Sequence, residues 1–454
     1  MNGCVAVFDI GKTNIKLVVF DRGGAILAER SAPNGPLEPD AAWPYLRLDT
    51  DRAWAFLIGA LKELGARFFI EAISIAAHGA AGVLVTNERD ALPAVDYEFD
   101  IDHEIAAEYD KVRPPFEETQ SPWLPRGLNL GRQAFYLERK FPREFAGARA
   151  FLGYPQYWSW RLSGVAATEF TAMGSHTDLW RPNEGERSSM VDKLDWRHLF
   201  PPLRKAWETL GPLKPDLAAA TGLATNVRIV CGAHDSNASL VPHLKSRREP
   251  FTVISTGTWV IIMAVGGKGR LDPEADMLAN VDVRGAPVPT ARFMGGREFA
   301  ILAGETPADA DEADVAAMVA SGVMALPAFS DQGGPFGGRK GRIEGAQPAT
   351  PKARAALATL YSALMTAHML RRLEAPGDLI VEGGFTRSSA FAAVLARLMS
   401  GRRVLIAPMS AGAAAGAALL AHWGEPHPAP RLGPARAWAL PGLEAYRERW
   451  ERAL

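Results

Sequence analysis

Val5-Ala-Val-Phe-Asp-Ile-Gly-Lys-Thr-Asn-Ile-Lys-Leu-Val-Val-Phe20 is the stretch that decides the fold of this chain. Two apolar runs, Val5–Phe8 and Leu17–Phe20, flank a tight glycine turn, and this pattern predicts a β-hairpin. The turn gathers backbone N–H groups, hydroxyls and a carboxylate at one point, which suits a nucleotide phosphate with its Mg²⁺. The chain therefore opens with a candidate phosphate-binding hairpin.

Two other interpretations of this turn compete with phosphate binding. Gly-Lys-Thr between strands is also compatible with an ordinary hairpin. The same triplet occurs in the P-loop, but that motif needs a glycine five residues before its Gly-Lys pair, where this chain has Ala6. A strand rather than a helix also follows the turn. The P-loop is therefore excluded, while the plain hairpin stays open.

A similar strand–turn–strand pattern returns at Thr252–Val260, near the middle of the chain. A chain of 454 residues is too long for one ordinary core, so two or three domains are expected. The polar, turn-prone segment Lys245–Pro250 marks the predicted boundary. Two phosphate-type hairpins, one in each half, predict two related domains that close on one nucleotide.

Composition limits the partners and the compartment of the protein. Lys and Arg (50) nearly balance Asp and Glu (51), so no basic field favours nucleic acid or an anionic membrane. The first residues form a strand pattern rather than a signal peptide, and the longest apolar stretch, Ala411–Ala421, is too short to span a bilayer. We expect a cytoplasmic protein, monomeric or homodimeric, that binds neither nucleic acid nor membranes.

Hydrophobic periodicity places further elements along the chain. A helix over Asp192–Leu210, broken at Pro201-Pro202, and one helix over Ser236–His243 are predicted. The segment Pro93–Tyr97 has a strand pattern. The remaining expected elements are the strands Ala25–Glu29, Ala72–Ala77, Arg228–Cys231, Leu379–Val381 and Val404–Ile406, and the helices Arg52–Leu64, Arg132–Lys140, Pro155–Leu162, Pro351–Leu373, Ser388–Met399 and Ala411–Ala421.

Asp235 is the strongest candidate for a catalytic residue. It lies where a buried strand meets a helix, a position at which α/β proteins place active residues. Phosphoryl transfer to an alcohol needs a carboxylate that accepts the hydroxyl proton. An Asp before Ser-Asn-Ala is equally compatible with a helix N-cap, so the residue pattern alone leaves both roles open.

Two further strand ends carry weaker signals. His78-Gly79 follows a buried strand and could contact a substrate hydroxyl, although a single histidine there is more often a structural hydrogen-bonding residue. Gly383-Gly384 allows close approach of the backbone to a ligand such as adenosine, although a plain β–α turn is the more common case.

Taken together, these segments resemble the FGGY carbohydrate kinases, and the resemblance covers essentially the whole chain. Four motifs in order carry it: the two phosphate motifs, the motif with the general base, and the adenosine motif, which comprises two segments because a Gly/Ala helix follows it. Lys12 departs from the commoner Thr or Ala, and Phe385 stands where a third glycine is frequent. The matching segments are Asp9-Ile-Gly-Lys-Thr-Asn-Ile-Lys16, Gly232-Ala-His-Asp-Ser236, Ser255-Thr-Gly-Thr-Trp259, Glu382-Gly-Gly-Phe-Thr-Arg-Ser388 and Ser410-Ala-Gly-Ala-Ala-Ala-Gly-Ala-Ala-Leu-Leu420.

The resemblance implies an α/β fold of two actin-like, ribonuclease H-like ATPase domains with a nucleotide cleft between them. It implies an N-terminal FGGY domain over 1–244, with the sugar site, the base and the first phosphate turn. A C-terminal domain over 245–454 would carry the second phosphate turn and the adenosine site. The implied ligands are ATP, Mg²⁺ and a sugar.

Roles follow from the resemblance residue by residue. Asp235 is the implied base, and Asp9 is the residue that organises Mg²⁺, mostly through water. The implied sugar contacts are His78, Gly79, Tyr97, Glu98 and His234. The implied ATP contacts are Gly11, Lys12, Thr13, Asn14, Lys16, Thr256, Gly257, Thr258, Gly383 and Gly384.

His234-Asp235 together with Ser-x-Gly-Thr-Trp is similar to the rhamnulokinase and fuculokinase branches. We therefore expect phosphorylation of a primary hydroxyl of a 6-deoxy-ketohexose such as L-rhamnulose or L-fuculose. Alternative substrates are xylulose, ribulose, glycerol and erythritol. An alternative of another class is an actin-like ATPase with a regulatory or chaperone role.

Overall fold

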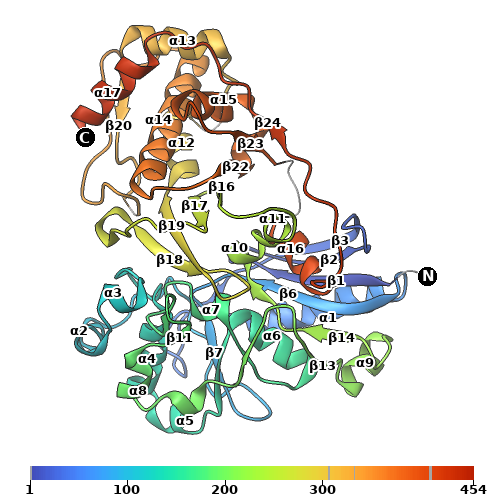
Figure 1. Cartoon of the computed structure of the whole chain (residues 1–454). Helices are drawn as coiled ribbons and strands as arrows, with labels where there is room; N and C mark the ends of the chain where they lie inside the picture. The colour runs from blue at the N-terminus through green and yellow to red at the C-terminus, as the bar shows by residue number, and fades with distance from the viewer. Residues whose placement is uncertain (1–2, 305–306, 332, 408–411) are drawn as a thin grey trace. The chain divides into compact units, whose positions relative to one another are not determined.

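The computed structural model describes residues 3–304, 307–331, 333–407 and 412–454. The chain forms two compact units (Figure 1). Unit 1 comprises Met1–Arg247, Ala279–Pro287 and Ala411–Ala429, and unit 2 comprises Arg248–Leu278, Val288–Ser410 and Pro430–Leu454. Ser410 and Ala411, at the start of the predicted Gly/Ala segment, lie outside the described residues.

A mixed sheet forms the centre of unit 1, with the strand order β13-β14-β6-β1-β2-β3. The predicted hairpin is present: β1 and β2 pair antiparallel from Val5↔Phe20 to Ile10↔Ile15. β3 continues the antiparallel pairing, whereas β6 and β14 run parallel to β1. The bounds are β1 Cys4–Ile10, β2 Asn14–Phe20, β3 Ile26–Pro33, β6 Ile70–Ala77, β13 Thr209–Pro212, β14 Arg228–Val230 and, paired with β6, β15 Ala233–His234.

Helices pack against this sheet because each has one apolar face. In α1 (Thr50–Gly65), Ala53, Leu57, Leu61 and Leu64 are buried, and Asp49 caps the helix by accepting from the backbone of Arg52. The helices α6 (Tyr154–Ser163) and α16 (Ala413–Leu420) also contact the sheet. The remaining helices of unit 1 are α2 His103–Val112, α3 Phe116–Thr119, α4 Leu130–Lys140, α5 Pro142–Ala146, α7 Phe170–Met173, α8 Ser189–Lys193, α9 Pro215–Thr221, α10 Asp235–Ala238 and α11 Val241–Ser246.

Unit 2 repeats the same plan in a sheet of order β18-β19-β17-β16-β22-β23-β24. β16 and β17 form a second antiparallel hairpin, β19 pairs antiparallel with β17, and β22 and β23 follow in parallel. The strands are β16 Phe251–Thr256, β17 Val260–Val265, β18 Met277–Val281, β19 Pro287–Phe293, β22 Asp378–Gly383, β23 Val404–Ile406 and β24 Gly433–Pro434. The helices of eight or more residues are α12 Gly295–Ala303, α13 Glu312–Ser321, α14 Pro351–Arg372, α15 Ser389–Leu398 and α17 Leu443–Ala453.

The two sheets share one topology. In each, three antiparallel strands (β3-β2-β1 and β19-β17-β16) are followed by two strands parallel to the first (β6-β14 and β22-β23). This is the ribonuclease H-like arrangement that the resemblance to the FGGY carbohydrate kinases implied. The expected fold class, α/β with two such domains, is confirmed. Among the described helices, none is long and apolar enough to cross a membrane.

Three local predictions are wrong. Asp192–Leu210 is not a broken helix: it contains the end of α8, a 3₁₀ turn at Arg197–Leu199, β12 (Leu203–Arg204) and the start of β13. Pro93–Tyr97 is irregular apart from a bridge between Arg47 and Val95. The helix expected over Ser236–His243 is two short helices, and the second one begins with Pro242 in its first turn, where proline is well tolerated.

Candidate active site

Three strands of unit 1 bring their carboxyl ends to the same edge of the sheet. Asp9 is the penultimate residue of β1 and pairs with Ala76 of β6. His78 follows β6 and donates its N–H to the carbonyl of Ile10 at 2.9 Å. The strand β15 ends at His234, which is followed by Asp235, the first residue of α10. Sheet pairing therefore places both carboxylates and both histidines at one edge.

Asp9 and Asp235 act on one another electrostatically. Burial raises the pKa of Asp9 to about 7, and the negative charge of Asp235 adds to this increase, while Lys16 opposes it. Two nearby carboxylates, one of them poorly solvated, form a site at which a cation would relieve repulsion. The pair therefore has the charge and the ligand chemistry that suit Mg²⁺, which takes oxygen ligands from one or two carboxylates and completes its shell with water and phosphate.

The two oxygens of the Asp235 carboxylate have different surroundings. Oδ1 accepts from the backbone N–H of Ser236 at 2.6 Å and from its hydroxyl at 3.3 Å, and it lies 3.2 Å from Nε2 of His234. In the described part of the chain, no hydrogen bond or ion pair falls on Oδ2. The side chain of Asp235 is 30% exposed, so solvent and small ligands can reach part of the carboxylate.

The structure also resolves the alternative role of Asp235. The residue at the N-cap of α10 is His234, and its side chain makes no capping hydrogen bond. Asp235 lies inside the first turn of the helix. The N-cap interpretation of Asp235 is therefore wrong, whereas its catalytic role stays a prediction.

His234 is held from behind by residues that the sequence analysis missed. Its Nδ1 lies 2.5 Å from Oδ1 of Asn237 and 3.0 Å from the hydroxyl of Ser175. The amide of Asn237 donates to the carbonyl of Val281 at 2.6 Å, so its oxygen faces the ring, and Nδ1 carries the proton. Asn237 follows the predicted base by two residues, so its position near the site could have been inferred from the sequence. No feature of the sequence indicated Ser175.

A second layer fixes the backbone of His234. Its N–H donates to the hydroxyl of Thr171 at 2.9 Å, and that hydroxyl donates to the carboxylate of Glu169 at 2.6 Å. Glu169 also caps α7 through the backbone of Thr171 and Ala172. Burial raises the pKa of Glu169 to about 7. The network fixes the strand end from which His234 and Asp235 project.

Gly79 lies directly against the imidazole ring of His234. A Cβ at position 79 would lie 2.5 Å from Nε2 of His234. Nδ1 of the neighbouring His78 lies 2.9 Å from the carbonyl oxygen of Gly79. Because a carbonyl only accepts, Nδ1 is the donor of this hydrogen bond. Burial lowers the pKa of His78. The structure thus brings three predicted sugar contacts, His78, Gly79 and His234, together with Asp235.

Tyr97 and Glu98, the other predicted sugar contacts, reach this group through Lys12. The ring of Tyr97 lies 5.8 Å from that of His78, centroid to centroid. The ammonium of Lys12 lies 4.7 Å from the centre of the Tyr97 ring and 3.3 Å from a carboxylate oxygen of Glu98. It also forms an ion pair with Asp96. Lys12 therefore lies among residues predicted for the sugar, not for ATP.

The rest of the first turn keeps its predicted form. Gly11 donates to the carbonyl of Asn14 at 2.9 Å, which closes the turn, and Asn34 donates to the carbonyl of Gly11 at 2.8 Å. Thr13 and Asn14 are exposed. Lys16 is half-exposed and lies 3.4 Å from Glu29. ATP binding by these residues stays a prediction.

The second turn belongs to unit 2. Gly257 and Thr258 are exposed, and Gly257 donates to the carbonyl of Trp259 at 2.9 Å. Thr256 is buried: its hydroxyl donates to the carbonyl of Glu382 at 2.6 Å and accepts from the N–H of Phe385 at 3.0 Å. The side chain of Thr256 therefore ties β16 to the turn after β22 and is not available to a phosphate in this arrangement.

Packing of the backbone requires a glycine at position 383. Its φ is +87°, and a Cβ there would lie 2.1 Å from the carbonyl oxygen of Thr256. Only glycine fits this close approach of β16 and β22. Gly384 is exposed at the same turn. The plain-turn interpretation thus accounts for Gly383 without a ligand, and its contact with adenosine stays a prediction.

The site is not a preformed metal cage. Across residues 3–304, 307–331, 333–407 and 412–454, no group of three His, Cys, Asp or Glu side chains could hold a metal ion. This does not exclude Mg²⁺, which is commonly bound through one or two carboxylates together with substrate phosphates.

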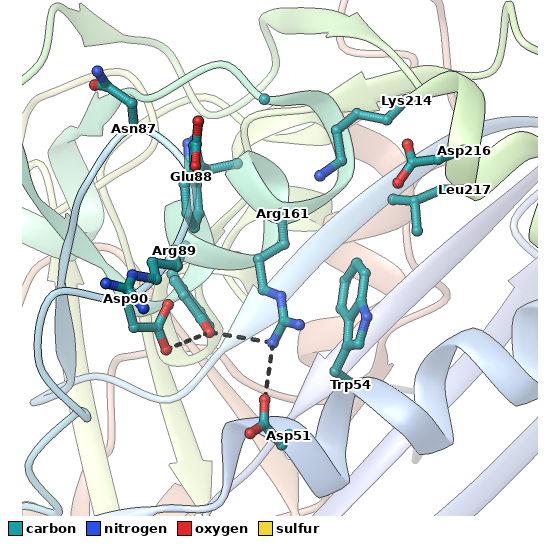
Figure 2. Close-up of a pocket in the computed structure, with 13 residues that line it drawn as sticks. Asp51, Trp54, Asn87, Glu88, Arg89, Asp90, Arg161, Lys214, Asp216 and Leu217 are labelled. Atoms are coloured by element: carbon teal, nitrogen blue, oxygen red, sulfur yellow. Dashed lines mark hydrogen bonds and ion pairs between the residues drawn. The ribbon is translucent and has the colours of Figure 1, made fainter.

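Another hollow of unit 1, of about 660 Å³, contains none of the predicted site residues (Figure 2). Arg161 crosses it: the guanidinium lies 4.2 Å from the ring centre of Trp54, donates to the hydroxyl of Tyr157 at 3.2 Å and faces Asp51 at 3.8 Å. Tyr157 in turn donates to Asp90 at 3.0 Å. Through these contacts, the polar side chains that line the hollow bind to one another.

Comparison with known proteins defines the class. A model described as "FGGY family of carbohydrate kinases, N-terminal domain" matches residues 129–242, and one described as "Carbohydrate kinase FGGY, C-terminal domain" matches residues 248–429. A carbohydrate kinase from Novosphingobium aromaticivorans, known by its crystal structure, is 35% identical, with a TM-score of 0.90 over 100% of this chain and 98% of that one.

Two further similarities are more distant. An L-fuculokinase of Salmonella typhi is 24% identical over 275 residues, which are 58% of this chain and 57% of that protein. The chain thus matches little more than half the length of this curated relative. The ligand-bound xylulose kinase of Lactobacillus acidophilus shares the fold, with a TM-score of 0.82, 15% identity and coverage of 99% and 96%.

The repeated ribonuclease H-like sheet therefore defines a protein of the actin-like fold class. Within that class, the chain belongs to the FGGY family of carbohydrate kinases. The family predicted from four short motifs is confirmed.

Proposed function

We propose that the protein transfers the γ-phosphoryl group of ATP to a primary hydroxyl of a ketose sugar. The observation that carries the proposal is the asymmetry of Asp235: Oδ1 accepts from Ser236, while no hydrogen bond from the described residues falls on Oδ2 of this partly exposed side chain. A general base needs such an open oxygen within reach of the attacking hydroxyl. Its neighbour Asp9 supplies the second carboxylate that phosphoryl transfer with Mg²⁺ requires.

Each residue has a defined task in this proposal. Oδ2 of Asp235 takes the proton as the sugar oxygen attacks phosphorus. His234, whose Nε2 lies 3.2 Å from Oδ1, can present its ring edge to a sugar hydroxyl. Asp9 would hold Mg²⁺ through water, and the bound ion would neutralise charge that develops on the phosphates. The exposed backbone turns at Gly11–Asn14 and Thr256–Thr258 would receive the phosphates, and the Gly383-Gly384 turn the adenosine.

The substrate that we propose is a 6-deoxy-ketohexose such as L-fuculose or L-rhamnulose. His234 directly before the base and the name of the curated relative at 24% identity support it. Buried polar groups such as His78 and His234 would discriminate between hydroxyl configurations. Such discrimination exceeds the roughly 10- to 200-fold that an apolar wall gives per methylene.

A substrate panel with coupled ADP detection tests the proposal. It compares kcat/KM for L-fuculose, L-rhamnulose, D-xylulose, L-ribulose, erythritol and glycerol. We expect the highest value for L-fuculose or L-rhamnulose, and little ATP turnover without sugar. Highest efficiency on D-xylulose or glycerol would refute the substrate class, and sugar-independent ATP hydrolysis would favour an actin-like ATPase.

A further inference from the structure

Lys12 belongs to the first phosphate-type turn, but its ammonium does not face the open side of that turn. It pairs with Asp96, lies 3.3 Å from Glu98 and covers the ring of Tyr97 at 4.7 Å. The Lys12 side chain is only 17% exposed, and the Asp96 carboxylate is fully buried. A distance of 84 residues in sequence separates the two partners. The turn is therefore tied by one side chain to a distant segment, 96–98.

This segment is itself fixed, so the position of Lys12 is well defined. Oδ1 of Asp96 accepts from the N–H of Glu98 at 2.9 Å, and the N–H of Asp96 donates to the carbonyl of Leu46 at 2.9 Å. The carbonyl of Tyr97 accepts from Gly127 at 3.0 Å. If Lys12 moved away to a phosphate, it would leave a buried carboxylate without its cation, which is a costly state.

The surroundings of Lys12 are those of the predicted sugar contacts. Tyr97 packs edge-on against His78. The pKa of His78 is lowered by burial, and the charge of Lys12 acts in the same direction, against the opposing charges of Asp235 and Asp96. The charges of Lys12 and Asp235 thus both act on His78, in opposite directions. Two carboxylates beside it would also repel a triphosphate.

We infer that Lys12 is a specificity-determining residue of the sugar site and not a ligand of the ATP phosphates; this rests on the proposed function. An ammonium has three N–H donors; one is hydrogen-bonded to Asp96, and Glu98 lies 3.3 Å away as an ion-pair partner. A remaining donor is directed to a hydroxyl or carbonyl oxygen of an open-chain ketose. The half-exposed carboxylate of Glu98 accepts from the adjacent hydroxyl. With Lys12 as the donor and Glu98 as the acceptor, the site distinguishes sugars by the configuration of two neighbouring hydroxyls.

The test compares Lys12→Met with Lys16→Met, which removes the neighbouring ammonium of the same hairpin. We expect Lys12→Met to raise the KM of the best sugar by about 10- to 100-fold, the usual effect of losing a charged hydrogen bond, and to change the KM of ATP little. Lys12→Arg should restore part of the affinity because it keeps the charge. Lys16→Met should leave the KM of the sugar unchanged. Calorimetry of the sugar without nucleotide should show the same loss for Lys12→Met.

The outcomes separate this inference from the proposed function. If Lys12→Met raises the KM of ATP and leaves that of the sugar unchanged in an active kinase, the inference is overturned and the function stands. If sugars bind to the wild type, and more weakly to Lys12→Met, without any phosphoryl transfer, the function is refuted and the inference stands. Should Lys12→Met unfold, Glu98→Gln keeps the ion pair with Asp96 and must still weaken sugar binding; unchanged binding there contradicts the inference.

Discussion

Gly79→Ala is expected to disable the site without touching a charged residue. The added Cβ would lie 2.5 Å from Nε2 of His234 and 2.9 Å from Cδ2, whereas ordinary contacts begin at 3.4 Å. The ring must therefore move by about 1 Å, or the strand end must shift by that amount. The ring cannot retreat freely because Asn237 and Ser175 hold Nδ1. The 3.2 Å contact of His234 with Asp235 is the one that gives way.

Displacement of this size in an active site reduces kcat/KM by about 100-fold. Overpacking should also cost about 1–3 kcal/mol of unfolding free energy. The assay is sugar-dependent ADP formation, together with denaturant unfolding of the same preparation. Gly59→Ala is the matched control: residue 59 lies in α1 with nothing within 4 Å of the new Cβ, so stability should rise by about 0.5–1 kcal/mol with unchanged activity. Full activity of Gly79→Ala would refute the reasoning.

Three further outcomes are expected. Folded Asp9 keeps a proton up to a pKa of about 7 that the unfolded chain loses near 3.8, so its contribution to stability falls as the pH rises from about 4 to about 7. Asp9→Asn should make the fall of the melting temperature over this range less steep, with the slope from Glu169 remaining, and an equal slope would contradict the burial of the Asp9 carboxylate. Asn237→Leu leaves the carbonyl of Val281 without the Asn237 amide and Nδ1 of His234 with Ser175 alone, so calorimetry should record a loss of about 1–3 kcal/mol in unfolding free energy, while an unchanged unfolding free energy would mean that the contacts are dispensable. In Gly416→Ala, the Cβ would meet the carbonyl of Ala238 at 1.8 Å, so α16 must shift and thermal unfolding should begin earlier; a wild-type melting curve would disprove this close packing.

Local signals predicted the central elements well. The hairpin β1–β2 follows from apolar runs on either side of Gly11, since the residues that pair in the strands are close in sequence. The position of Asp235 at a strand end was also visible, because a short apolar run and a glycine precede it. Such features could be predicted because the residues that determine them are close together in the sequence.

Features that depend on distant partners could not be predicted. The direction of Lys12 is set by Asp96, and the need for glycine at 383 is set by the carbonyl of Thr256. Neither partner has a marker in the sequence around the residue that it constrains. The predicted contacts of Lys12 with the phosphates and of Gly383 with adenosine rest on local resemblance alone, and they stay predictions.

The wrong helix over Asp192–Leu210 has a similar cause. Trp196, Leu199 and Trp207 have helical spacing, but Trp196 and Leu199 are buried and Trp207 is partly exposed, and the two tryptophans make separate contacts. Trp207 stacks on Trp423 at 4.4 Å, and Trp196 donates to Glu138 at 3.0 Å. Aromatic residues buried by long-range contacts imitate the periodicity of a helix.

The measurement that tests the account most directly is single-turnover phosphoryl transfer by Asp235→Asn, with nucleotide and sugar binding measured on the same protein. The amide keeps the shape of the side chain and can still accept at Oδ1, but it cannot take the hydroxyl proton. We predict that the rate of transfer falls by about 100- to 10,000-fold while both ligands bind and the fold is retained. A rate near that of the wild type would contradict the role of Asp235 as the general base and, with it, the proposed site.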